Sequence, residues 1–266
     1  NTPTFSAIKN DKYIYIYIRE STCTFGEGSD LQRGMMFTVV CWLLVATGAG
    51  LTLVSGCSSN DIRACGMDFV PFFNSTRLAE GEAALQEQCR TYLGQTSCAE
   101  SYSTRCLQGL PRAVAVLGLE GAVTSYKDVC NKNSARHKVY IDNIACINQA
   151  GPRLHQCMNN ALVIFQTAVK KAPQKRKIAY SCCYYHELKE CFHDALVAKC
   201  NRPQVLEFFT KIMDEVFGDL LQLVCRQYKK NSPGCQSIPP LTLTRKDPSQ
   251  SHNIVETLTD LVNSFG

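Results

Sequence analysis

Residues 181–191 read SCCYYHELKEC, in which Cys182 and Cys183 are adjacent. Successive residues of an α-helix project about 100° apart, because one turn takes about 3.6 residues. Two adjacent cysteines on one helix therefore face two different neighbours. We expect their disulfides to join three helices at one level, with the tyrosines that follow and Leu188 filling the space beside the bridges.

The chain of 266 residues contains 16 cysteines. Cytosolic proteins keep their thiols reduced, so this content predicts an oxidising compartment. Removal of the first 56 residues takes away Cys23 and Cys41 and leaves an even number, so every remaining cysteine can be paired, although the sequence does not give the connectivity. The predicted disulfide cysteines are Cys57, Cys65, Cys89, Cys98, Cys106, Cys130, Cys146, Cys157, Cys182, Cys183, Cys191, Cys200, Cys225 and Cys235.

Residues 35–56 form an apolar segment that begins at Met35-Met36 and ends in small residues before Cys57. Such a segment, closed by Val54-Ser55-Gly56, has the form of a secretory signal peptide with its cleavage site. Its apolar run is about 20 residues long, so a single membrane anchor is the competing interpretation. We favour cleavage, because glycines interrupt the run and a polar, cysteine-rich region follows.

Residues 1–34 contain no methionine and precede a segment that works only at an N-terminus. We interpret them as translated upstream sequence and expect them to be disordered. The predicted organisation is therefore upstream sequence at 1–34, a signal peptide at 35–56 and a single secreted domain at 57–266.

The composition is that of a globular protein, with 45% hydrophobic and 19% charged residues. The formal net charge of +5 is mild, so it permits attraction to an acidic surface but does not indicate a nucleic-acid partner. We expect contact with a membrane only through the signal segment.

Beyond Cys57 the apolar residues recur at three- and four-residue steps, which is the pattern of helices. The clearest helix begins at Pro203, after the capping residue Asn201, and ends before Ser232-Pro233-Gly234. Further helices are predicted after Pro173, after Gly151-Pro152, and at 76–92, 97–109, 113–129, 135–149 and 252–265. The run AVAVLGLEGAV at 113–123 is apolar nearly all round; a strand is the alternative, but its length favours a central buried helix. The chain thus predicts an all-α, disulfide-rich bundle of about seven to nine helices.

Cys182-Cys183 followed by His186 superficially resembles the catalytic helix of secreted phospholipases A2. In that family an aspartate follows the histidine, the next cysteine comes three positions after the histidine, and a glycine-rich loop upstream holds calcium. Here Glu187 follows His186, the next cysteine is Cys191, and the loop is missing. We therefore expect a helix tied by disulfides rather than a calcium-dependent enzyme.

His186, Glu190 and His193 fall at helical positions i, i+4 and i+7, so all three lie on one face and are weak candidates for a metal site. The H-E-x-x-H motif of zinc proteases is not formed, and on a charged helix face such a trio is usually solvated. We expect no metal and no cofactor. His137 and His155 are isolated histidines, for which a structural or exposed position is expected.

A basic run and a glycosylation sequon are expected at the surface. The run KKAPQKRK at 170–177 holds five basic residues at a boundary between two helices. It is a candidate for binding acidic glycans or lipids, but a solvated turn explains it without a partner. Asn74-Ser75-Thr76 is a glycosylation sequon, and we expect Asn74 to be glycosylated.

Within residues 180–241 the cysteines follow the order Cys182-Cys183, Cys191-Phe192, Cys200, Cys225 and Cys235, the last shortly before Ile238-Pro239-Pro240-Leu241. This order resembles that of arthropod secreted proteins similar to the twenty-seven-kilodalton haemolymph glycoprotein. The resemblance implies an all-helical, disulfide-rich, extracellular glycoprotein, and it carries no functional residues to this chain.

These observations leave two hypotheses of function. The first is a secreted, non-enzymatic protein that binds an extracellular protein or an apolar small molecule. A cavity that side chains do not fill favours the small molecule, whereas a filled core with an exposed apolar patch favours a protein. The second is a secreted hydrolase, phospholipase-like or metal-dependent, with its site around His186 and His193. It requires a cleft there, with a carboxylate or a metal within bonding distance.

Overall fold

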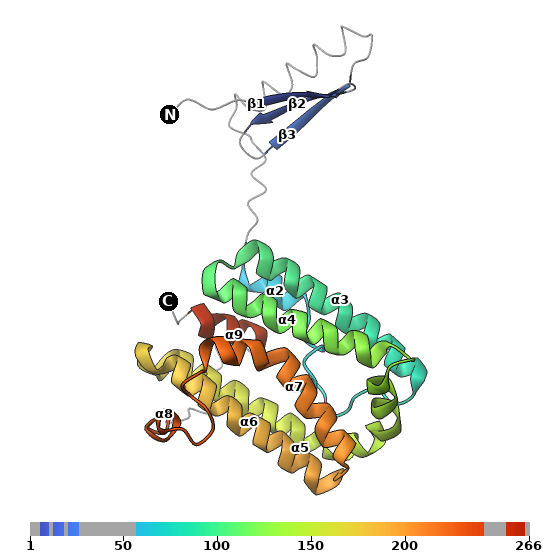
Figure 1. Cartoon of the computed structure of the whole chain (residues 1–266), viewed down its shortest axis with the longest axis vertical. Helices are drawn as coiled ribbons and strands as arrows, with labels where there is room; N and C mark the ends of the chain where they lie inside the picture. Colours follow the sequence, from blue (N-terminus) through green and yellow to red (C-terminus); the bar gives the residue numbers. More distant parts are fainter. Residues whose placement is uncertain (1–5, 11–12, 19–20, 27–56, 242–253, 264–266) are drawn as a thin grey trace. The chain divides into compact units, whose positions relative to one another are not determined.

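A computed structural model of the chain describes residues 6–10, 13–18, 21–26, 57–241 and 254–263 (Figure 1). The chain divides into two compact units, Asn1–Gly56 and Cys57–Gly266, and each is described by itself. The predicted signal peptide at 35–56 lies outside the described residues.

The described part of the N-terminal unit is an antiparallel sheet of β1 (Ser6–Asn10), β2 (Tyr13–Ile18) and β3 (Ser21–Gly26), in that order. Ile14 of β2 lies opposite Lys9 of β1 and Phe25 of β3. The strands differ from the disorder that we expected for residues 1–34. Tyrosine and isoleucine alternate in β2, and this period of two, in aromatic and β-branched residues, is a strand signal that the expectation left out of account.

From Cys57 onward the described residues form eight α-helices and one 3-10 turn, without a strand. The long helices are α3 (Glu82–Cys106), α4 (Gly109–Cys130), α5 (Ala135–Lys171), α6 (Lys177–Lys199) and α7 (Pro203–Val224). The short ones are α2 (Ser59–Ala64), η1 (Gln174–Arg176), α8 (Pro233–Gln236) and α9 (Ile254–Asn263). None of the described helices is both long and apolar enough to cross a bilayer. The prediction of an all-α, disulfide-rich fold is confirmed for this unit.

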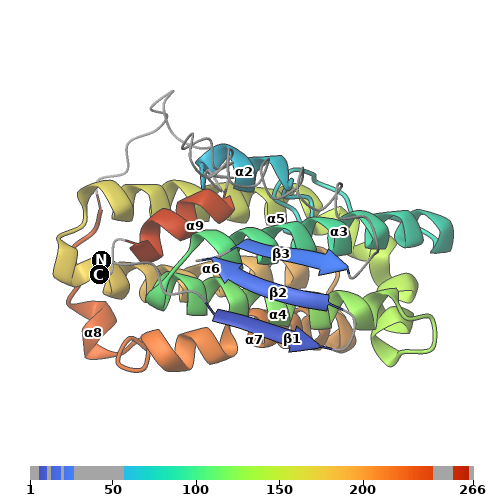
Figure 2. The same ribbon diagram turned by 90° about the horizontal axis from the view of Figure 1, so that it is seen from above.

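The long helices lie side by side in antiparallel pairs (Figures 1 and 2). Short turns at 107–108 and 172–176 reverse the chain, so α3 pairs with α4 and α5 pairs with α6. The helix α7 packs against α4 on one side and α6 on the other. The last helix, α9, contacts α5, α4 and α2, so the C-terminal part of the chain closes back on the N-terminal part of this unit.

The predicted helix start at Gly151-Pro152 is wrong, because α5 runs through both residues without a break. A proline inside a helix costs about 3 kcal/mol, since it removes one backbone hydrogen bond. Here Ile147, Ala150 and Leu154 on either side are fully or almost fully buried, and this burial holds the helix together. The glycine serves close packing: a Cβ at Gly151 would lie 1.8 Å from the carbonyl oxygen of Thr76.

The predicted helices at 76–92 and 97–109 are also corrected, since one helix, α3, replaces them. This helix starts only at Glu82, because the backbone of Leu78 makes hydrogen bonds outside a helix. The N–H of Leu78 donates to Asn148 Oδ1 at 2.8 Å, and the carbonyl of Leu78 accepts from Asn148 Nδ2 at 2.9 Å. The expected gap near Thr96 is absent because this residue is fully buried inside the helix, where its Oγ1 donates to the carbonyl of Tyr92.

The core has two parts. The larger one is built by α5, α6, the start of α7 and the segment around Phe72, with Leu154, Leu196 and Val205 fully or almost fully buried. The smaller one gathers residues of α2, α3 and α4. The run 113–123 is helical as predicted, but the expected burial holds only at Leu119 and Ala122; most of the run is half-buried.

All fourteen cysteines from Cys57 onward are joined in seven disulfides, and these fall into two separate sets. In the first set the pairs are Cys57–Cys106, Cys65–Cys98 and Cys89–Cys130. In the second set they are Cys146–Cys200, Cys157–Cys191, Cys182–Cys225 and Cys183–Cys235. No bridge links residues 57–130 to residues 146–235. Apart from the chain that connects them, these two halves of the bundle are therefore held against each other by noncovalent contacts.

The helices α4 and α7 approach each other closely at Gly121 of α4, where a Cβ would lie 2.2 Å from the carbonyl oxygen of Glu215 in α7. One turn earlier, a Cβ at Gly118 would come no nearer than 3.8 Å to a heavy atom. We predict that Gly121→Ala lowers the free energy of unfolding by about 1–3 kcal/mol, because α4 and α7 must separate. Gly118→Ala should raise it by about 0.5–1 kcal/mol, the ordinary gain of alanine in a helix.

The measurement is chemical denaturation of the oxidised protein, with both variants and the unchanged chain in parallel. Equal effects of the two substitutions would contradict the assigned contact between α4 and α7.

Candidate functional site

The paired cysteines of α6 bind two different elements. Cys182 is joined to Cys225, the residue directly after α7, and Cys183 to Cys235 in α8. Tyr185 and Leu188 are buried beside them. The prediction that the adjacent cysteines bind two different partners is confirmed, although one partner, Cys225, lies just after α7 rather than inside a helix.

His186 is half-buried and its Nε2 lies 3.2 Å from the carbonyl oxygen of Tyr228. A carbonyl only accepts, so Nε2 carries the proton and donates. Its ring also packs edge-on against the ring of Tyr185, with the ring centres 5.9 Å apart. The imidazole is thus oriented by the backbone after α7, not by a carboxylate.

The other two candidate metal ligands have partners of their own. Glu190 forms an ion pair with Lys230, and His193, with 59% of its side chain exposed, lies 3.4 Å from Oδ1 of the neighbouring Asp194. No group of three or more His, Cys, Asp or Glu side chains in the described part of the chain is arranged to hold a metal ion. The structure therefore does not bring His186, Glu190 and His193 together as one site.

The two isolated histidines make hydrogen bonds between different segments of the bundle. His137 is buried; its Nδ1 lies 2.8 Å from the carbonyl of Val129 and its Nε2 lies 3.0 Å from Glu82. The Nδ1 of His155 lies 2.8 Å from the carbonyl of Phe72, which fixes the segment before α3 onto α5. Both positions fit the structural role expected from the sequence.

A polar contact that sequence reasoning missed joins α4, α5 and α7 at Glu215. Ser125 of α4 donates to Glu215 Oε2 at 2.6 Å, and Arg136 of α5 donates to both carboxylate oxygens, at 2.7 and 2.5 Å. The bond from Arg136 is the main cause that lowers the pKa of Glu215, although burial opposes it. The three residues lie far apart in the sequence, so no local pattern indicated the contact.

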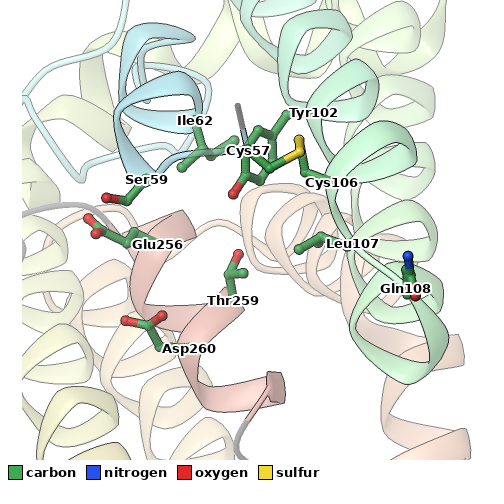
Figure 3. A pocket seen from close by; sticks show the side chains of 10 residues that line it. All are labelled: Cys57, Ser59, Ile62, Tyr102, Cys106, Leu107, Gln108, Glu256, Thr259 and Asp260. Atoms are coloured by element: carbon green, nitrogen blue, oxygen red, sulfur yellow. A yellow bond between two sulfur atoms is a disulfide. The ribbon is translucent and has the colours of Figure 1, made fainter. Parts of the chain in front are cut away.

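An open pocket of about 500 Å³ lies between α2, the end of α3 and α9 (Figure 3). Its apolar lining consists of Ile62, the ring of Tyr102, Leu107 and the Cys57–Cys106 disulfide. Ile62, Tyr102 and Leu107 are all buried, so these side chains are fixed by the smaller core behind them.

The polar lining comes mainly from α9. Glu256, Thr259 and Asp260 lie along one side of the pocket, and Ser59 and Gln108 complete the rim (Figure 3). Sequence reasoning missed the pocket because three distant segments form it. The one available signal was the spacing of Glu256 and Asp260, which places both carboxylates on one face of the last helix.

The position of α9 is set by polar contacts to two helices. Arg63 of α2 donates from Nε and Nη2 to the two oxygens of Glu256, at 2.8 and 2.7 Å. Thr257 accepts from Gln166 of α5 at 3.3 Å. A two-pronged guanidinium–carboxylate pair fixes direction as well as distance, so it holds this wall of the pocket in place.

The remaining sequence features lie at the surface. Asn74 is exposed in the segment between α2 and α3, and its Nδ2 donates to Asp68 at 3.2 Å. The basic run at 170–177 forms the turn between α5 and α6, with Lys175 and Arg176 exposed in η1. Glycosylation at Asn74 and binding by the basic turn stay predictions.

No family model, no curated protein and no solved structure matches the chain. The resemblance to the arthropod haemolymph glycoproteins therefore stays a prediction from the order of the cysteines.

The ion pair at Glu215 generates a prediction about acid stability. Because Arg136 depresses the pKa of Glu215, the carboxylate's stabilising contribution is complete above its ordinary pKa of 4.5 and is lost as the pH falls through the lower value of the folded state. Glu215→Gln should lower the free energy of unfolding at neutral pH by about 1 kcal/mol, since both partners are partly exposed. The variant should also lose less stability than the unchanged chain in acid.

Glu207→Gln is the matched control, because Glu207 is on the same helix and pairs with Lys211 at 2.7 Å with both side chains exposed. It should change the stability little. Denaturant titrations from neutral pH to below pH 4 measure all three proteins. An unchanged pH profile for Glu215→Gln would rule out this role of the ion pair.

Proposed function

We propose that this chain is an exported, non-enzymatic helical protein that binds a small molecule with an apolar body in the pocket between α2, α3 and α9. The observation that carries the proposal is the pocket itself: a space of about 500 Å³ whose apolar lining is buried and fixed. Pockets of this size that combine apolar side chains with polar groups at fixed positions are where proteins hold small ligands. In this pocket the polar part of the lining is somewhat larger than the apolar part.

The alternative of a protein partner lacks comparable support. Among the described residues, the large apolar side chains that are exposed are Leu110 on α4, at 39%, and Val197 on α6, at 37%. They belong to different halves of the bundle and are single exposed residues, which are common on monomeric proteins. The small molecule is therefore the partner that the geometry supports best.

Seven disulfides support an oxidising, extracellular setting for this activity, because thiols in the cytosol are kept reduced. Removal of a signal peptide at 35–56 and a glycan at Asn74 fit the same setting. In this proposal His186, Glu190 and His193 have no catalytic role, since each is engaged with a separate neighbour.

The test uses N-phenyl-1-naphthylamine, an uncharged probe whose fluorescence rises in apolar surroundings. We predict saturable binding to the oxidised protein and a loss of affinity of about tenfold or more in Ser59→Trp, because an indole at this exposed rim position fills the pocket. Ser101→Trp is the matched control: Ser101 is also an exposed serine, but it does not line the pocket.

Both variants should keep the melting temperature of the unchanged chain, which separates a blocked pocket from a damaged fold. If the probe does not bind, or if Ser59→Trp binds it as tightly as Ser101→Trp, the proposed function is wrong.

A further inference from the structure

The pocket is lined by a tyrosine hydroxyl that has no hydrogen-bond partner among the described residues. Tyr102 is only 8% exposed, and its hydroxyl points into the pocket (Figure 3). Among the described residues this hydroxyl has no hydrogen-bond partner. The ring is buried while the hydroxyl reaches the open pocket, so the hydroxyl is available to a molecule that occupies the pocket.

Charge around this hydroxyl is predominantly negative. The carboxylates of Asp61, Glu256 and Asp260 all raise the pKa of Tyr102, in addition to the effect of its burial. In the described part of the chain the guanidinium of Arg63 faces them, and it donates two hydrogen bonds to Glu256. Burial, and then the nearby charge of Glu256, raise the pKa of Asp260, although Arg63 opposes the shift.

We propose that the ligand of this pocket is a monocation, an amine with an apolar, ring-sized body. Its ammonium group lies at Asp260 and donates a hydrogen bond to the hydroxyl of Tyr102. Its apolar body lies against Ile62, Leu107 and the Cys57–Cys106 disulfide. This inference rests on the proposed function and adds the charge of the ligand to it.

The chemistry of the pocket fits a cation better than an anion or a neutral molecule of the same size. A carboxylate ligand in the pocket would lie close to the carboxylates of Asp260 and Glu256, and these like charges would repel it. A neutral alcohol would satisfy Tyr102 but leave the negative charge uncompensated. An ammonium satisfies both, and a charge-assisted hydrogen bond is about twice as strong as a neutral one.

Three probes of nearly equal size separate these possibilities: 2-phenylethylammonium, 2-phenylethanol and phenylacetate. We expect the ammonium to displace N-phenyl-1-naphthylamine at a concentration about tenfold lower than the alcohol, and phenylacetate to be the weakest. The advantage of the ammonium should shrink as salt is added, because the rim of the pocket is open to solvent.

Two variants test the assigned groups. Asp260→Asn should remove the preference for the ammonium while the alcohol binds as before. Tyr102→Phe should weaken the ammonium and the alcohol alike and leave the melting temperature unchanged, since the hydroxyl has no partner within the described chain. Asp142→Asn is the matched control, because Asp142 is a surface carboxylate of α5 that pairs with Lys138.

The outcomes separate this inference from the proposed function. If the alcohol displaces the probe as well as the ammonium does, or if Asp260→Asn keeps the preference, the charge of the ligand is wrongly assigned while the pocket remains a binding site. If the naphthylamine itself does not bind, the proposed function fails first.

Discussion

The contact between α4 and α7 is the interaction on which the helical unit depends. Three disulfides join cysteines within residues 57–130, and four join cysteines within residues 146–235. No disulfide joins one of these halves to the other. Among the contacts between the halves are the close approach at Gly121 and the carboxylate of Glu215, which binds α4 and α5 at once. On α5, Gly151 lies against Thr76 and Asn148 binds the backbone of Leu78. Each half is covalently constrained, whereas their association is an ordinary packed interface.

This division explains how the pocket is built. One wall belongs to the first half, where the cysteines on either side of α2 bind it to α3. The opposite wall is α9, which follows the last cysteine. It is held by Ile254 and Leu261, which are buried in the larger core, and by the ion pair between Arg63 and Glu256. An apolar wall, formed by α2 and α3 and fixed by disulfides, thus faces a polar wall formed by α9. This is the arrangement in which a ligand can stabilise the closed contact between distant parts of a chain.

The sequence predicted what depends on local periodicity and failed where tertiary contacts decide. The start of the helix at Pro203 was predicted correctly, although the helix ends at Val224 rather than just before Ser232. The adjacent cysteines at 182 and 183 gave the right bridging geometry, because it follows from the helical repeat alone. Gly151-Pro152 indicated a helix start, but burial of the neighbouring residues kept α5 continuous, and the glycine allows the approach of Thr76. The short helices α2 and α8 and the pocket were not predicted. Tyr102 and Asp260 lie far apart in the chain but line the same pocket. No local sequence pattern predicts that they come together.

The most direct test of this account is the disulfide map of the oxidised protein, obtained by peptide mass spectrometry without reduction. Because Cys182 and Cys183 cannot be separated by a protease, fragmentation or partial reduction must assign their partners. We predict that every linked peptide stays within 57–130 or within 146–235, with Cys182 bound to Cys225 and Cys183 to Cys235. A single bridge between the two halves, or a bond between Cys182 and Cys183 themselves, would contradict the account.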